Sequence, residues 1–172
     1  THAYTNDMFV VDADTNAIGV HVWPGYTLSA VSGGTGTSTI LVLDSLADGT
    51  NLNGAIKLNT AANENDGIQF QLNGSSFNFS TTDERLYFGA RIMLADTGAV
   101  AQADWLIGLL VTSTTAVDTT ADDGVFFHSL DGSASVGFTT KKAGLLTGST
   151  VITTSAVDTW YTLEFWYNRL EN

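Results

Sequence analysis

The sequence predicts an all-β protein, an antiparallel β-sandwich or jelly roll, on three observations. About ten short segments have strand-like patterns, and turn residues separate them about every eight to fifteen positions. No amphipathic pattern of helical period extends over about ten residues. With 44% hydrophobic, 10% aromatic and 14% charged residues, the composition is that of a chain that buries a core.

The middle of the chain holds the strongest strand patterns. Between Leu86 and Leu94 every second residue is apolar, so one face can cover a core while Arg91, on the other face, stays in water. The run from Trp105 to Thr112 is apolar on both faces, which predicts a central strand covered on both sides.

The last strong pattern runs from Trp160 to Tyr167. It predicts one face with Tyr161, Leu163, Phe165 and Tyr167, and an opposite face with Trp160 and Trp166. Weaker or shorter runs complete the set of expected strands: 18–23, 39–43, 55–58, 68–73, 124–130, 136–140 and 150–153.

Turn signals connect these runs. Asn73-Gly74 and Asp131-Gly132 are dipeptides that accept the positive φ of tight hairpin turns, and each stands between two alternating segments. The Gly144–Ser149 stretch is expected to be flexible.

At 172 residues the chain has the size of a single domain. Residues 1–17 are expected to form a polar, acidic N-terminal arm, and residues 18–172 one jelly-roll domain. The sequence stops at Asn172 directly after an apolar strand, so either the C-terminus is incomplete or a partner covers that edge.

Charge and composition exclude several function classes. Eighteen acidic and six basic residues give a formal net charge of −12, and the basic residues form no stripe that could bind phosphates, so no nucleic-acid partner is expected. The absence of cysteine excludes disulfides and thiolate chemistry. No apolar run approaches the roughly 18 residues of a membrane helix, so no membrane partner is expected either.

No catalytic residues are expected, and the protein is predicted not to be an enzyme. His2, His21 and His128 lie in separate segments, and His128, beside Phe126 and Phe127, is expected in a core or an interface. No Gly-x-Ser-x-Gly elbow occurs, and no two glutamates share a strand at the spacing that a retaining glycosidase needs.

Two further kinds of site remain open. Asp118, Asp122 and Asp123 are clustered hard oxygen ligands that suit calcium, although such clusters in loops are more often solvated; no other cofactor is expected. Exposed tryptophans could stack on sugars, but Trp23, Trp105, Trp160 and Trp166 all lie in apolar runs, which favours a core or a subunit interface.

Four segments in succession resemble a known family: Leu86–Leu94, Asp104–Thr115, Asp123–Phe127 and Trp160–Tyr167. Together they are similar to structural proteins of tailed bacteriophages, notably marine phages, which are concanavalin-like jelly rolls that serve as capsid decoration or minor capsid proteins. The resemblance covers about half of the chain, from Ile68 to Tyr167, and its motifs carry no catalytic residue.

The resemblance implies a non-enzymatic virion protein, a decoration or cement protein on the outer surface of a capsid. Its partners would be the major capsid protein and copies of itself. Expected contacts are the arm residues Met8, Phe9 and Val10, which could add to a neighbour's sheet, and Trp160, Trp166 and Tyr167 in a subunit interface. The alternative is a carbohydrate-binding module or lectin-like domain on a phage surface or fibre, with surface glycans as partners.

Overall fold

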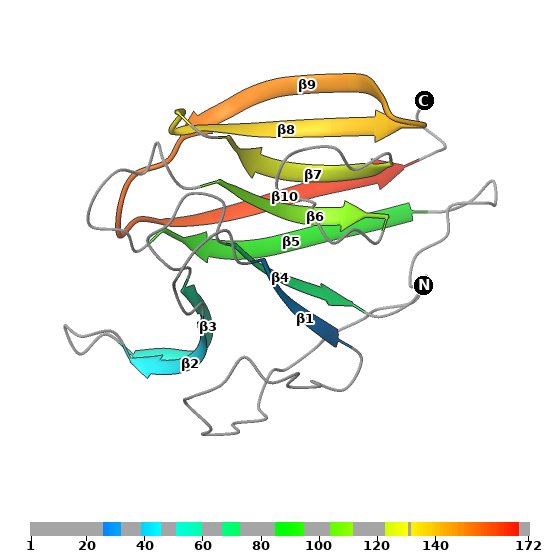
Figure 1. Ribbon diagram of the computed structural model, residues 1–172. Coiled ribbons are helices and arrows are strands. Elements are labelled where there is room, and N and C mark those ends of the chain that lie inside the picture. Colours follow the sequence, from blue (N-terminus) through cyan, green and yellow to red (C-terminus); the bar gives the residue numbers. More distant parts are fainter. Residues whose placement is uncertain are drawn as a thin grey trace. The chain divides into compact units, whose positions relative to one another are not determined.

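The computed structural model describes residues 26–31, 39–45, 51–59, 67–72, 85–94, 104–111, 123–130 and 132–168. These residues form ten strands and no helix, and every ladder between two strands is antiparallel (Figure 1). An isolated parallel bridge joins Leu94 and Val157. The all-β, antiparallel part of the prediction is confirmed over this part of the chain. Within it, no helix is long and apolar enough to cross a membrane.

The chain divides into two compact units, Thr1–Ser76 and Phe77–Asn172. The expected single domain over residues 18–172 and the concanavalin-like topology stay predictions. The expected strand at 18–23 and the Asn73-Gly74 hairpin lie outside the described residues.

The first unit holds two antiparallel pairs. Strand β1 (Tyr26–Val31) pairs with β4 (Gly67–Leu72), and β2 (Thr39–Ser45) pairs with β3 (Asn51–Asn59). The register sets Tyr26 opposite Leu72, so its ring reaches diagonally to Phe70 and stacks on it with centroids 4.5 Å apart. Strand β1 had no sequence prediction, although apolar and polar residues alternate from Tyr26 to Ala30.

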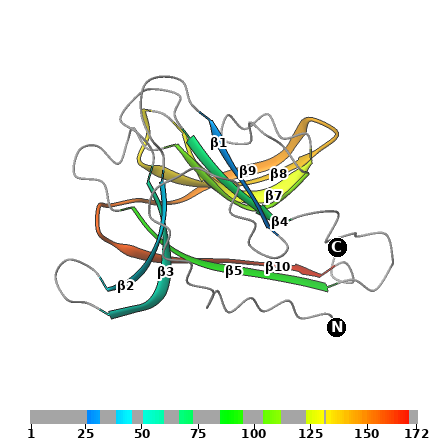
Figure 2. The ribbon, with the colours of Figure 1, turned by 60° about the horizontal axis from the view of Figure 1, so that its bottom comes forward.

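The second unit holds a four-stranded and a two-stranded sheet. The larger one has the order β6 (Trp105–Leu110), β7 (Gly124–Ser129), β8 (Ser135–Lys142), β9 (Leu145–Thr154). The smaller one pairs β5 (Arg85–Met93) with β10 (Trp160–Asn168), two strands far apart in the sequence. Figure 2 shows β5 and β10 side by side in one layer and β7, β8 and β9 in another.

The two sheets of the second unit share one hydrophobic core. Phe127 and Val136 from the larger sheet and Leu163 and Phe165 from β10 are its buried members. The ring of Phe165 lies within 6.0 Å, centroid to centroid, of Phe88, Phe127 and Phe138, in tilted or stacked arrangements. Aromatic pairs at such distances add to the free energy gained from burying their area.

The faces predicted for β5 and β10 are confirmed. Leu86, Phe88 and Ile92 of β5 and Tyr161, Leu163 and Phe165 of β10 pack in or against the core, whereas Arg91 and Trp166 are exposed. A turn at Gly132, between β7 and β8, agrees with the prediction: the Ser133 N–H donates to the Leu130 carbonyl oxygen, and Gly132 has a φ of 74°.

One prediction is wrong. The Gly144–Ser149 stretch was expected to be flexible, but Leu145–Ser149 form the first half of β9, because Ala143 and Gly144, both at positive φ, close a tight turn from β8. Strand β6 was expected in the centre of a sheet; among the described strands it pairs with β7 alone, and its central place stays a prediction. All six residues of β6 are half-buried, so its apolar residues indicate that both faces of the strand are covered. They do not indicate that both edges of the strand are paired.

Truncating Phe165 tests this core. The Phe165→Ala substitution removes the ring that contacts Phe88, Phe127 and Phe138, so we expect the free energy of unfolding to fall by about 3–5 kcal/mol. Urea unfolding followed by tryptophan fluorescence measures it. Thr162→Ala, at an exposed position of the same strand, should change stability by less than about 0.5 kcal/mol. Equal losses in both variants would contradict the shared core.

Candidate binding surfaces

The outward face of β5 and β10 carries aromatic and charged side chains together. We call Tyr87, Arg91, Trp160, Glu164 and Trp166 the aromatic face. They share one side because side chains alternate along each strand, and the register sets Tyr87 opposite Trp166, Gly89 opposite Glu164 and Arg91 opposite Thr162. The sequence pattern thus places three aromatic rings and two charges of opposite sign on one side of a two-stranded sheet.

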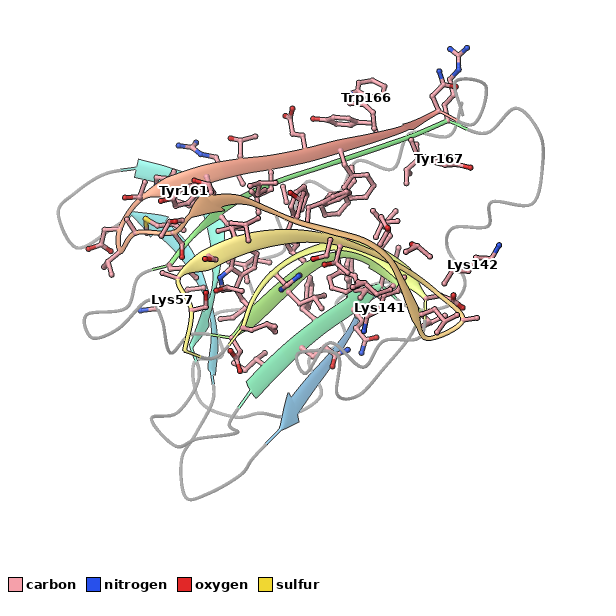
Figure 3. All side chains as sticks on the ribbon, turned by 90° about the horizontal axis from the view of Figure 1, so that it is seen from above. Lys57, Lys141, Lys142, Tyr161, Trp166 and Tyr167 are labelled. Atoms are coloured by element: carbon pink, nitrogen blue, oxygen red, sulfur yellow. The ribbon has the colours of Figure 1, made fainter. Side chains whose placement is uncertain are left out.

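Trp166 is the most exposed large apolar side chain among the described residues, at 75% of its accessible area. Its ring centroid lies 4.8 Å from that of Tyr87, with the planes inclined by 48°. Figure 3 shows Trp166 on the outer side of β10, away from the side where Tyr167 lies. A tryptophan this exposed is costly to leave in water, so the pair is a candidate contact for a ligand or a partner.

The Tyr87 ring lies across Gly89. The Tyr87 hydroxyl donates a 2.8 Å hydrogen bond to Glu164 Oε1, and a Cβ atom on Gly89 would lie only 2.7 Å from that hydroxyl oxygen. The hydrogen bond to the carboxylate, followed by desolvation and the charge of Glu164, raises the pKa of Tyr87 above 10.0. Glycine at position 89 therefore lets the ring lie flat on the sheet and fixes Glu164 beside Trp166.

The other residues expected in a subunit interface differ from Trp166. Trp160 is half-buried under the Arg91 guanidinium, whose Cζ lies 4.7 Å from the ring centroid, a cation–π contact. Tyr167 is half-buried on the opposite side of β10. Met8, Phe9 and Val10 lie outside the described residues. Of the six expected contact residues, the structure thus exposes Trp166.

A second exposed surface lies on β9, at the end of the larger sheet (Figure 1). Among its ten residues none is charged, and Leu145, Leu146, Val151 and Ile152 are all exposed, Leu146 by 62% and Val151 by 67%. We call this strand the β9 edge. The sequence prediction missed it because a flexible loop was expected over its first half; the uncharged run from Leu145 to Thr154 was the available signal.

A polar chain crosses β7, β8 and β9. His128 Nε2 and Thr139 Oγ1 are 2.9 Å apart, and the Thr139 hydroxyl donates to Ser149 Oγ at 3.2 Å. Because that hydroxyl gives its proton to Ser149, it must accept one from His128, so Nε2 carries the proton and the buried Nδ1 is left without a hydrogen-bond partner. The imidazole lies over Gly137, where a Cβ atom would be 2.8 Å from Nε2.

This histidine is half-buried, as expected for a core or interface position. Burial, and to a lesser degree the positive charge of Lys141, lowers the pKa of His128 below its ordinary value of 6.5. A second proton would have to go to the buried Nδ1, which has no acceptor near it, so the geometry favours the neutral ring. Its hydrogen-bond partner is the Thr139 hydroxyl, which in turn bonds to Ser149. These hydrogen bonds hold β7, β8 and β9 in place relative to one another.

The structure gives one of the three expected calcium ligands an ordinary role. Asp123 Oδ1 accepts the backbone N–H of Ala143 and so holds the β8–β9 turn. Asp118 and Asp122 lie outside the described residues. Among the residues that are described, no group of three His, Asp or Glu side chains could hold a metal ion. Calcium at the Asp118–Asp123 cluster stays a prediction.

The lowered pKa of His128 makes stability depend on pH. Below pH 6.5 the unfolded chain binds a proton that the folded state does not yet accept, so stability should fall as the pH drops from about 6.5 through the lowered folded pKa. Unfolding midpoints in urea at pH 5.5 and 7.5 measure the effect. His128→Asn should reduce the difference between the two pH values; an unchanged difference would contradict the assignment.

Comparisons of the chain with protein-family models, with curated proteins and with solved structures give no match. The function is therefore inferred from the aromatic face and the β9 edge.

Proposed function

We propose that the protein is a non-enzymatic virion structural protein, a decoration or cement protein that binds the outer surface of a capsid. The fold would be a β-sandwich of the concanavalin-like jelly-roll type. The observation that carries the proposal is that the four most exposed large apolar side chains among the described residues lie at two separate places, Trp166 on the smaller sheet and Leu145, Leu146 and Val151 of the β9 edge on the larger one. The resemblance of residues 68–167 to phage structural proteins supports it.

A protein that cements a lattice must contact at least two neighbours. Exposed apolar side chains on two different sheets suit this task, because each can be buried against a different neighbour. The acidic chain, with a formal net charge of −12, would dock on a surface with basic residues and repel copies of itself elsewhere. Copies bound to the assembled lattice but not to its separated parts would stabilise the lattice by mass action.

Particles that lack the protein provide the direct test. We expect the purified chain to bind them and to raise the temperature at which they release their contents, because the contacts are made only by the assembled lattice. Val151→Lys and Trp166→Ala should each weaken binding at least tenfold, since each removes or charges an exposed apolar contact. Co-sedimentation and a thermal release assay measure both effects.

The matched control is Val111→Lys, the same substitution as Val151→Lys at an exposed position directly after β6, outside both the aromatic face and the β9 edge. It should bind within about twofold of the unsubstituted chain, since rim charges contribute little to affinity. A chain that does not bind, or particles equally heat-stable without it, would contradict the proposal.

A second candidate is a carbohydrate-binding module, and the geometry of the aromatic face favours it. Trp166 offers an exposed flat ring beside Glu164, whose carboxylate is held by the Tyr87 hydroxyl. A pyranose has apolar C–H faces and hydroxyl groups at its rim. It could stack on the indole while a hydroxyl donates to Glu164, which accepts several hydrogen bonds.

Tryptophan fluorescence tests this candidate. Titration with neutral polysaccharides should change the emission, and Trp166→Ala should remove the change while Val151→Thr, on the other sheet, leaves it intact. Glu164→Gln should weaken binding several-fold, because a charge-assisted hydrogen bond becomes a neutral one. The same titration repeated with a calcium chelator shows whether sugar binding depends on calcium. If no glycan alters the emission, or the Trp166→Ala signal persists, the aromatic face is not a sugar site.

A further inference from the structure

We propose that β9 pairs with β9 of a second copy of this chain, antiparallel, about a two-fold axis that passes beside Ser149. The inference rests on the proposed function, for which it names the neighbour at the β9 edge. The pairing would join the four-stranded sheets of two copies into one continuous sheet.

The β9 edge has the properties of a strand that accepts a neighbour. Among the described strands it pairs with β8 alone, on one side, and nine of its ten residues are exposed. Edge strands are commonly protected by charged residues or proline, and this strand contains neither. Its four exposed aliphatic side chains, Leu145, Leu146, Val151 and Ile152, remain in water unless another surface covers them.

Charge favours a second copy in antiparallel orientation. Two copies of a chain with a net charge of −12 repel each other over most of their surfaces, so an uncharged strand is where they approach at least cost. Lys141 and Lys142 precede β9 and outnumber Asp123, the carboxylate that holds the β8–β9 turn, whereas Asp158 follows β9. Figure 3 shows both lysines at one end of the β8–β9 hairpin. Antiparallel pairing brings the lysine end of one copy to the Asp158 end of the other, whereas parallel pairing would bring like charges together.

The ladder with β8 determines the register. Val151 lies opposite Gly137, Ser149 opposite Thr139 and Leu146 opposite Lys141. Gly137, Thr139 and Lys141 are alternate residues of β8, so their partners Val151, Ser149 and Leu146 share one face of β9. The steps between the three are equal although the numbering is not, because β9 has an extra residue at Thr147, where the register shifts. A two-fold axis at Ser149 therefore places Val151 of each copy beside Leu146 of the other.

The oligomeric state tests the pairing first. Sedimentation velocity of the unsubstituted chain should show a dimer whose fraction rises with concentration. Val151→Lys should lower the association constant at least tenfold, because it sets a charge against the partner's Leu146. Thr162→Lys, on β10, should leave association unchanged. A chain that is monomeric at all concentrations, or equal loss in both variants, would overturn the inference.

Single cysteines test the register, because the chain contains none of its own. Ser149→Cys should form a disulfide-linked dimer under mild oxidation, since residues opposite each other in an antiparallel pair have the separation that a disulfide needs. Thr162→Cys should remain monomeric on a non-reducing gel. Cross-linking at position 162 but not at position 149, with both variants folded by circular dichroism, would overturn the proposed axis.

The outcomes separate this inference from the proposed function. A monomeric chain that still stabilises particles would overturn the pairing and leave the decoration role standing. A dimer cross-linked through position 149 that does not bind particles would support the pairing and overturn the decoration role.

Discussion

The packing of Phe165 against Phe88, Phe127 and Phe138 holds the second unit together. Strands β5 and β10 are separated by more than sixty residues, and closing so long a loop costs conformational entropy that the pairing of two strands alone does not offset. Burial of Leu163 and Phe165 against the larger sheet offsets it. Because side chains alternate along β10, the same burial turns Trp166 outward, so the core determines what the aromatic face presents.

Two glycines shape the polar chemistry of the surfaces. Tyr87 lies across Gly89 on the smaller sheet, and His128 lies across Gly137 on the larger one; a Cβ atom at either glycine would collide with the ring. In each case the ring then reaches a polar group on a neighbouring strand, Glu164 for Tyr87 and Thr139 for His128. The two glycines thus leave room for the rings of Tyr87 and His128. The hydrogen bonds of these rings then connect adjacent strands.

The two exposed surfaces differ in chemistry, which suits different partners. The aromatic face combines rings with Glu164 and Arg91, so it can form directional hydrogen bonds as well as apolar contacts. The β9 edge has no charge and offers backbone groups with aliphatic side chains, which suits addition of another strand. The proposed role would use both kinds of contact, one for a copy of the chain and the other for a different molecule.

The all-β class, nine of the ten described strands at least in part, and the inward faces of β5 and β10 follow from the sequence alone. Alternation at period two follows directly from strand geometry and needs no knowledge of distant residues. It also placed Trp166 away from Leu163 and Phe165. The sequence prediction missed β1 and the first half of β9, where the residues Ala143 and Gly144 form a tight turn without the usual asparagine or aspartate.

Which strands pair, and which side chains stay exposed, depends on the tertiary structure. The pairing of β5 with β10 depends on long-range burial, so no local pattern announces it. Trp160 and Trp166 share a face, yet Arg91 from the neighbouring strand covers Trp160, whereas Tyr87 lies beside Trp166 and leaves it exposed. Exposure depends on what lies across the strand, and that is a property of the register, which the sequence of one strand does not contain.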